Sequence, residues 1–254
     1  MHALVVVPTY NEADNLVSVV ARLRRAAGDL DVLVVDDDSP DGTGEIADQL
    51  AVGDPHVHVL HRTAKEGLGA AYRAGFAWGL ERSYDAFVEM DADLSHDPAD
   101  VPRLLAALGG ADLVIGSRYI PGGGVEDWPA RRERLSRGGN LYVRVMTGLP
   151  VADATSGFRA FRRPALEALD AVAVRSEGYC FQIEMALRAW RGGFRVMEVP
   201  ITFVERRAGA SKISRRIVVE AVVRTALWGL TGPRRPAPPP PESIATGINI
   251  PPRC

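Results

Sequence analysis

The sequence predicts an α/β fold in which helices cover both faces of a mostly parallel sheet. Short apolar runs rich in β-branched residues alternate with longer stretches of helical periodicity, and acidic clusters follow two of the runs. The chain has 254 residues, of which 46% are hydrophobic and 24% charged, and it contains no visible internal repeat. These values suit one large globular domain with a sizeable core.

The expected strands are short and apolar, as is typical of strands buried on both faces. They lie at 4–7 (LVVV), 32–35 (VLVV), 57–60 (VHVL), 87–90 (FVEM) and 113–115 (LVI). Between them, helical periodicity predicts helices at about 13–27, 43–51, 68–82 and 98–108. Beyond residue 115 we expect a Gly-rich loop at 121–124, an Arg-rich helix near 131–147, a strand at 156–162, a helix at 179–191 and two short strands near 194–205.

The segment 214–230 has the pattern of an amphipathic helix. Arg216, Glu220 and Arg224 recur every fourth residue and form a narrow charged stripe. The remaining arc is apolar: Ile217, Val218, Val219, Val222, Val223, Leu227, Trp228 and Leu230. Such a helix suits a membrane interface, with Trp228 near the headgroups, although packing on the core or on a partner subunit is the alternative. We expect one domain over 1–232 and a disordered Pro-rich tail over 233–254.

Composition and charge limit the function classes. The net charge of −2 gives no general attraction to nucleic acid, so no nucleic-acid partner is expected. The two cysteines form neither a disulfide framework nor a metal site. The start of the chain has no signal-peptide pattern, and no apolar stretch reaches the roughly 18 residues of a membrane span. We therefore expect a cytoplasmic protein whose membrane contact is peripheral.

Two acidic clusters carry the clearest chemical signal. Asp36–Asp38 follow one expected strand, and Asp91 and Asp93 follow another. The carboxyl ends of parallel strands meet at one edge of the sheet, where these like charges repel unless a cation lies between them. Mg²⁺ or Mn²⁺ suits such a site, because it takes one or two carboxylates and completes its shell with water and phosphates. The competing interpretation is that the acids only cap the following helices.

Several motifs together resemble a known family. They are residues 8–12 (PTYNE), 36–43 (DDDSPDGT), 90–93 (MDAD), 116–119 (GSRY), 153–158 (DATSGF) and 209–212 (GASK). The first four are similar to the successive motifs of family-2 glycosyltransferases with the GT-A fold, a Rossmann-like architecture. The form SPDGT, with the last two motifs, resembles polyprenol- or dolichol-phosphate mannose synthases. The resemblance extends over about residues 3 to 230.

The resemblance implies a role for each matching residue. Those implied to hold the guanosine and ribose are Pro8, Tyr10, Glu12, Val35 and Asp37. Asp91 and Asp93 would bind the metal, with Ser95 as a third ligand where the family can have Gln, and Ala92 would touch the nucleotide. Arg118 would reach the donor or acceptor phosphate, and Arg206 and Lys212 would bring positive charge to the pyrophosphate. Asp93, Arg118 and Lys212 are therefore the catalytic candidates. Asp38 stands where Gly is common.

The implied reaction is the transfer of mannose from GDP-mannose to a polyprenyl phosphate, with inversion, to give polyprenyl-phosphate β-mannose and GDP. A phosphate monoester is largely dianionic at pH 7, so the acceptor is its own nucleophile. Three alternatives remain: a polyprenyl-phosphate transferase that uses UDP-glucose or another UDP-sugar, a nucleotidyltransferase, and an inactive protein that tethers another membrane enzyme. The sequence leaves open whether a separate membrane protein recruits this one.

Other signals favour structural roles. His56, His58 and His61 lie on an expected strand away from the acidic residues, so we interpret them as structural. The segment 67–69 (GLG) opens a helix but lacks the G-x-G-x-x-G pattern that follows a strand in nicotinamide-binding proteins. Asp153 and Arg159 either line the acceptor site or form a salt bridge at a strand end.

Overall fold

The computed structural model describes residues 1–205 and 215–231, with only the backbone described over 215–219. The two site candidates Arg206 and Lys212 and the expected disordered tail lie outside the described residues. The strands are β1 (Ala3–Thr9), β2 (Asp31–Asp36), β3 (Val57–His61), β4 (Ala86–Glu89), β5 (Leu113–Ser117), β6 (Gly124–Glu126), β7 (Arg159–Arg162), β8 (Val196–Pro200) and β9 (Thr202–Val204).

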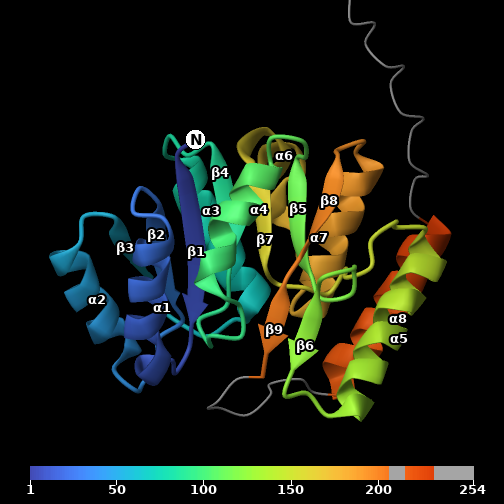
Figure 1. The fold of residues 1–254 in the computed structure, drawn as a ribbon, viewed down its shortest axis with the longest axis horizontal. Coiled ribbons are helices and arrows are strands. Elements are labelled where there is room, and N and C mark those ends of the chain that lie inside the picture. The colour runs from blue at the N-terminus through green and yellow to red at the C-terminus, as the bar shows by residue number, and fades with distance from the viewer. Residues whose placement is uncertain (206–214, 232–254) are drawn as a thin grey trace, which may run out of the picture.

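The helices alternate with the strands through the first half of the chain (Figure 1). The α-helices are α1 (Ala13–Ala26), α2 (Thr43–Gly53), α3 (Leu68–Leu80), α4 (Val101–Ala107), α5 (Ala130–Thr147), α6 (Arg163–Ala168), α7 (Tyr179–Arg191) and α8 (Arg215–Thr231). Two short 3-10 helices are η1 (Pro98–Asp100) and η2 (Ala171–Ala173). The helix expected at 98–108 is thus divided into η1 and α4, and α6 was not predicted.

The main sheet has seven strands in the order β3-β2-β1-β4-β7-β5-β8. All neighbours are parallel except at β7, which runs antiparallel to both β4 and β5. The predicted mostly parallel α/β fold is therefore confirmed. The two short strands expected near 194–205 belong to different sheets, because β8 ends the main sheet while β9 pairs with β6 beside it.

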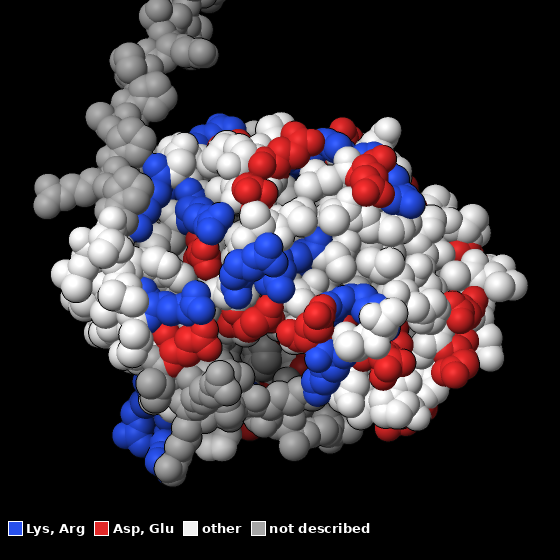
Figure 2. Space-filling view, turned by 180° about the vertical axis from the view of Figure 1, so that it is seen from behind, with Lys and Arg blue, Asp and Glu red and all other residues white. Residues whose placement is uncertain are grey.

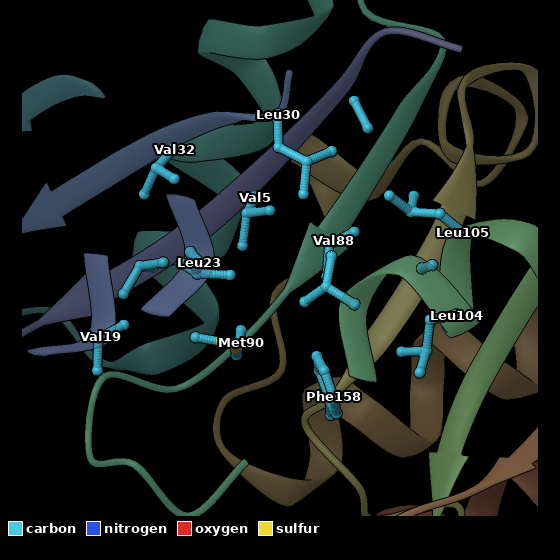
Figure 3. Close-up of a cluster of buried hydrophobic side chains, with 14 of the residues drawn as sticks. Val5, Val19, Leu23, Leu30, Val32, Val88, Met90, Leu104, Leu105 and Phe158 are labelled. Carbon is cyan, nitrogen blue, oxygen red and sulfur yellow. The ribbon is translucent and has the colours of Figure 1, made fainter. Parts of the chain in front are cut away.

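The side chains of the central strands alternate between two apolar layers. Val5 and Val32 point to the layer that α1 and α4 cover, and Leu23 of α1, Leu104 of α4 and Val88 belong to the same apolar cluster (Figure 3). Leu4, Val6, Leu33 and Val35 point to the opposite layer, which α3 and α7 cover. Burial on both faces holds the strands in register, so their carboxyl ends form a rigid edge.

Helices α5 and α8 lie side by side at one end of the molecule (Figure 1). The Tyr142 hydroxyl of α5 donates to the Val222 carbonyl of α8 at 3.0 Å. Trp228 is partly buried against the core, whereas Val222, Val223, Leu227 and Leu230 are exposed. One face of α8 is therefore packed and another presents apolar side chains to solvent; the membrane-interface interpretation stays a prediction.

Surface charge in the described structure is locally balanced. Figure 2 shows Lys and Arg interspersed with Asp and Glu over the face opposite to that of Figure 1. Many arginines are paired with a carboxylate one helical turn away, as in Arg163 with Glu167 and Arg188 with Glu184. None of the helices in the described part of the chain has both the length and the apolarity that a membrane span needs.

Candidate active site

A cavity of about 490 Å³ lies where β1, β2 and β4 end. Eight of the predicted site residues line it: Pro8, Tyr10, Glu12, Asp37, Asp91, Ala92, Asp93 and Arg118. They come from segments as far apart in sequence as residues 8 and 118, and the parallel sheet brings them together. Val35 and Ser95 are not among the lining residues, so their predicted contacts remain predictions.

The first acidic cluster has three different local roles. Asp36 is buried and accepts hydrogen bonds from the Thr9 hydroxyl at 3.0 Å and the Ser39 hydroxyl at 2.6 Å, so it holds the turn after β2. Asp37 lines the cavity and pairs with Arg62. Burial raises the pKa of Asp37, even though Arg62 acts to lower it.

Asp38 is exposed and has a φ of 58°. This left-handed conformation is most accessible to glycine, and Asp and Asn are enriched among the other residues that adopt it. The backbone of this turn accounts for Gly being common at this position in the family that the sequence resembles. Asp38 therefore departs from the pattern without disturbing the turn.

The second acidic cluster lies directly after β4. Asp91 accepts a hydrogen bond from the buried Tyr72 hydroxyl at 3.3 Å, and Asp93 accepts one from the Ser95 backbone N–H at 3.1 Å. The Ser95 hydroxyl is itself buried and has no hydrogen-bond partner among the described residues. Both aspartates line the cavity, so their carboxylates are the natural site for a divalent cation.

The residues present fit Mg²⁺ or Mn²⁺, which can complete their coordination with water and phosphate oxygens. They do not fit a metal whose ligands all come from the protein. The described residues contain no group of three or more His, Cys, Asp or Glu side chains that could hold a metal ion. Two carboxylates beside an open cavity are the set with which Mg²⁺ retains waters and binds substrate phosphates. An all-protein site of the structural zinc kind, which has four ligands, does not match this arrangement.

Arg118 is held by a buried ion pair that the sequence left unresolved. Its guanidinium donates from Nε and Nη2 to the two carboxylate oxygens of Asp153, both at 2.7 Å, and from Nη2 to the Thr155 hydroxyl at 2.9 Å. Burial acts to lower the pKa of Arg118, but the Asp153 carboxylate raises it above its ordinary value. Arg118 is therefore a rigid, permanently charged group at the cavity wall.

Arg159, considered together with Asp153 in the sequence, lies elsewhere. It is fully buried and donates to the backbone carbonyls of Ser156, Gln182 and Ala154. It organises the chain that leads into β7 and is not among the residues that line the cavity. Neither the acceptor-site nor the salt-bridge interpretation describes Arg159, whereas Asp153 forms its salt bridge with Arg118.

Sequence reasoning missed an aromatic and cationic part of the cavity. Trp128 and Phe203 meet at 5.3 Å between ring centroids, and the Arg132 guanidinium lies 4.1 Å from the Trp128 ring centroid. The Arg118 guanidinium lies 5.5 Å from both rings. The Arg-rich segment 131–147 was the available signal, but it did not distinguish Arg132 from its neighbours. Arg118 pairs with Asp153 and Arg132 pairs with Glu205, so this part offers ion-paired guanidinium groups beside apolar surface.

His96 and Lys65 were also not selected from the sequence. Burial lowers the pKa of His96 to about 4, so its imidazole is neutral at neutral pH. The His96 ring stacks on Phe158 with centroids 5.0 Å apart and lines the cavity.

The Lys65 ammonium lies 3.6 Å from the Tyr10 ring centroid at the cavity wall. Lys65 is one of only two lysines in the chain, which was a signal for its importance.

Two of the three histidines interpreted as structural lie at the far end of the sheet. The third, His61, ends β3 next to Asp36, so the prediction that it lies away from the acidic residues is wrong, although it does not line the cavity. His56 and His58 both contact Asp31, which begins β2 at the opposite end of the sheet. His61 pairs with Asp48 at 2.9 Å on an exposed surface. None of the three lines the cavity, so their structural interpretation agrees with their positions.

A mostly parallel sheet with two carboxylates and fixed guanidinium groups at the carboxyl ends of its strands is typical of enzymes that bind nucleotide phosphates. Residues 4–170 match the model of Glycosyl transferase family 2, so the chain belongs to that family. It is an α/β glycosyltransferase.

Similar proteins agree with this assignment. The chain is 57% identical over 91% of its length to an undecaprenyl-phosphate mannosyltransferase of Micrococcus luteus, of which it covers 95%. It is 55% identical over 90% of its length to a polyprenol monophosphomannose synthase of Mycolicibacterium smegmatis, of which it covers 87%. It is 39% identical over 87% of its length to a dolichol-phosphate mannosyltransferase of Pyrococcus furiosus, but spans only 61% of that protein.

Solved structures match the fold. A mannosyltransferase from Pyrobaculum calidifontis, in complex with GDP-Man and Mn²⁺, aligns with a TM-score of 0.65 at 19% identity and covers 92% of this chain and 66% of that one. A mycobacterial protein aligns with the same TM-score at 21% identity, over 90% of this chain and 74% of that one. At these identities the likeness is one of fold alone.

Proposed function

We propose that this protein transfers mannose from GDP-mannose to a polyprenyl monophosphate and releases GDP and a polyprenyl-phosphate β-mannose. The observation that carries the proposal is the cavity, which combines paired aspartates on one side with Arg118 and Arg132 on the other. The mannose synthases named above, which are 55–57% identical over most of the chain, support the choice of donor and acceptor.

The two sides of the cavity suit the two substrates. Pro8, Tyr10, Glu12 and Asp37 end or follow β1 and β2 and would hold the nucleoside. Arg118 and Arg132 lie beside Trp128 and would take the acceptor phosphate. Arg118 holds Asp153 through Nε and Nη2, and Arg132 pairs with Glu205, so each would bind the phosphate through its remaining guanidinium N–H groups. Arg206 and Lys212 remain proposed ligands of the pyrophosphate, as the sequence motif implies.

The chemical step follows from the charge on the acceptor. A phosphate oxygen attacks the anomeric carbon of mannose from the side opposite to GDP, a new carbon–oxygen bond forms, and the bond to the β-phosphate breaks with its electron pair on GDP. Because the phosphate is already deprotonated, no general base is required. The protein contributes positioning and charge neutralisation, and inversion at the anomeric carbon follows.

Asp91 and Asp93 would hold Mg²⁺ or Mn²⁺, with Ser95 as the proposed further ligand. When bound, the cation neutralises charge on the pyrophosphate of the donor. The two carboxylates do not distinguish the two metals, so the preference is a matter for titration.

The acceptor places the enzyme at a membrane. The proposed location is the cytoplasmic face, through peripheral contact by α5 and α8. The exposed apolar side chains of α8 and the adjacent exposed Leu141 and Val145 of α5 support this contact. A membrane-protein partner on the same surface is a separate proposal, and transfer by the purified protein alone would show that such a partner is not required.

The deciding experiment measures transfer of radiolabelled mannose from GDP-mannose to organic-extractable polyprenyl phosphate with Mg²⁺ or Mn²⁺. We expect metal-dependent label in the lipid that is lost in Asp93→Asn. A matched control is Asp97→Asn in the same loop, where the side chain is about half exposed, caps η1 and pairs with Arg22. This control should retain activity.

The other outcomes each favour a different function. Label from UDP-glucose but not from GDP-mannose would support the polyprenyl-phosphate glucosyltransferase alternative. Release of pyrophosphate from a nucleoside triphosphate would indicate a nucleotidyltransferase. Retention of configuration in the mannosyl product would contradict direct attack by the acceptor phosphate.

A further inference from the structure

A second, smaller cavity lies beside α5, outside the proposed substrate site. Its volume is about 150 Å³, and Tyr119, Arg137, Asn140, Leu141 and Arg144 are among its lining residues. It shares no lining residue with the larger cavity. Sites for drug-sized ligands typically measure about 300–1,000 Å³, so this cavity suits one small group, such as a phosphate with its nearest substituents.

The cavity has a basic rim. Arg137 and Arg144 are both exposed and lie seven residues apart, which places them two turns apart on one side of α5. Arg137 pairs with Glu133 at 2.8 Å and lies 4.5 Å from the Tyr119 ring centroid. Arg144 makes no ion pair with any residue that the structure describes. A guanidinium group without a carboxylate partner next to a hollow is a strong donor for an anion.

The same side of α5 borders an apolar surface. Leu141 lines the cavity and is 51% exposed, and Val145, one turn further along α5, is 72% exposed. Next to them α8 exposes Val222, and Gly229 of α8 lies close to the Met146 backbone. Exposed apolar side chains beside a cationic hollow match a lipid, which has an anionic headgroup and apolar chains.

We propose that this cavity binds the phosphodiester headgroup of an anionic membrane phospholipid, distinct from the polyprenyl phosphate acceptor. The phosphate lies between Arg137 and Arg144, and the acyl chains lie along Leu141 and Val145. This inference rests on the proposed function in one respect, because it takes α5 and α8 to face a membrane.

The smaller cavity is connected to the active site through two of its lining residues, Asn140 and Tyr119. The Asn140 amide donates to the Thr155 hydroxyl at 3.1 Å and lies 3.4 Å from Asp153, and both of these groups hold the Arg118 guanidinium. Tyr119 follows Arg118 directly, and its hydroxyl donates to Ser136 of α5 at 2.7 Å. Headgroup binding therefore holds α5 against the ion pair that positions Arg118, and lowers the KM for a membrane-borne acceptor.

The test compares binding of the full-length protein to phosphatidylcholine vesicles with and without phosphatidylglycerol. The variant is Arg137→Ala/Arg144→Ala, and the matched control is Arg131→Ala/Arg134→Ala, which removes the same charge from exposed positions of the same helix outside the cavity. We expect the cavity variant to lose about tenfold or more of its binding to phosphatidylglycerol vesicles, since each basic residue near an anionic surface contributes measurably. The control should lose clearly less. Equal losses would mean diffuse surface charge and would overturn the proposal.

Two further measurements distinguish a lipid ligand from a free phosphate and test the transfer reaction by itself. If soluble glycerol phosphate binds the wild type without vesicles as tightly as phosphatidylglycerol vesicles do, the ligand is a free phosphate and the lipid assignment is wrong. Transfer to a short-chain, water-soluble polyprenyl phosphate tests the proposed function separately, and the cavity variant should retain it. If the cavity variant binds phosphatidylglycerol vesicles as tightly as the wild type does while transfer is intact, only the lipid site is refuted. Absent transfer in the wild type would refute the proposed function. Equal thermal midpoints establish that both variants fold.

Discussion

Arg118 and Asp153 form a buried ion pair at the wall of the active site. The Arg118 side chain is 6% exposed and that of Asp153 is not exposed at all, so water cannot replace either partner. Burial acts to raise the pKa of Asp153, but the charge of Arg118 overcomes this effect and lowers it. The two groups therefore stay ionised together and hold one geometry.

Replacing Asp153 by Asn leaves the Arg118 charge buried without its counterion. We expect Asp153→Asn to lower the free energy of unfolding by about 3–5 kcal/mol, the range for breaking a buried pair. Urea denaturation measures this loss. The control is Glu167→Gln, which removes the more exposed partner of Arg163 and should change stability by no more than about 0.5 kcal/mol. Similar small losses in both variants would contradict the importance of the buried pair.

A second residue-scale prediction concerns Asp31, at the end of the sheet far from the cavity. Asp31 accepts a hydrogen bond from the Tyr84 hydroxyl at 2.7 Å and is within 3.5 Å of a ring nitrogen of each of His2, His56 and His58. Burial acts to raise the pKa of Asp31, but the hydrogen bonds from Tyr84 and His56 lower it overall. A carboxyl group with a lowered pKa in the folded state stabilises the fold above its unfolded pKa of about 3.9.

We therefore expect Asp31→Asn to lower the free energy of unfolding by about 1–3 kcal/mol at pH 5. The difference from the wild type should shrink as the pH falls through the lowered pKa of Asp31, because the wild-type carboxyl then becomes neutral too. Urea denaturation at about pH 5 and about pH 3 measures both effects. A difference that stays constant with pH would show that the charge of Asp31 contributes nothing. Mannosyl transfer should be unchanged, since none of these residues lines the cavity.

The sequence predicted some residues of the site and missed others. Asp91 and Asp93 were identifiable because two acids follow a strand whose end the parallel topology places at the crevice. Arg132, Trp128 and Phe203 were not, because they approach the cavity from two segments without regular sequence spacing, and only tertiary packing brings them together. The ion-pair partner of Asp153 could not be predicted from the sequence. Whether Asp153 pairs with Arg118 or with Arg159 depends on side-chain packing that no local sequence pattern encodes.

Among the elements, α3 packs closely against the sheet at two glycines that lie one turn apart. A Cβ atom on Gly75 would lie 2.4 Å from a methyl group of Val6, and one on Gly79 would lie 2.5 Å from the Phe87 ring. The absence of side chains at these two positions lets the helix axis approach β1 and β4. Since Leu68 and Ala71 of α3 line the cavity, this contact also fixes part of the cavity wall.

Gly75→Ala should therefore destabilise the fold by about 1–3 kcal/mol through overpacking. Gly138 of α5 is the matched comparison, because a Cβ there meets nothing within 4 Å. Gly138→Ala should stabilise by about 0.4–1 kcal/mol, since alanine lowers the entropy of the unfolded chain without strain. Thermal or urea denaturation of the two variants gives opposite signs if this account is right. Destabilisation by both would mean that helix geometry, and not close packing, decides the effect.

The elements of the first half of the chain were predictable because apolar runs and helical periodicity alternate without interruption up to residue 115. The position of β7 was not, because its sequence is equally compatible with any neighbour. It enters the sheet antiparallel between β4 and β5, where Phe161 meets Phe87 on one side and Leu113 on the other. The position of β7 is therefore determined by the gap between β4 and β5 and not by the sequence of β7 alone.

At the scale of the whole molecule, the cavity lies between two functional halves. One half, formed by the ends of β1, β2 and β4, carries Asp37, Asp91 and Asp93, and the other carries Arg118 and Arg132. The carboxylates of the acidic half repel the phosphates of a nucleoside diphosphate unless a divalent cation lies between the carboxylates and the phosphates. Binding of GDP and binding of the metal should therefore depend on each other.

This dependence is measurable without turnover. We expect GDP with Mn²⁺ to raise the thermal midpoint of unfolding, because a ligand present at 100 times its Kd stabilises the folded state by about 2.7 kcal/mol. GDP with a chelator, or Mn²⁺ alone, should have a much smaller effect than the two together. In Asp93→Asn the combined effect should fall to the level of GDP alone, whereas Asp97→Asn should behave as the wild type. Equal midpoint shifts with and without Mn²⁺ would mean that the acidic half does not hold the cation for the nucleotide, and the pyrophosphate would then have to depend on the basic residues alone.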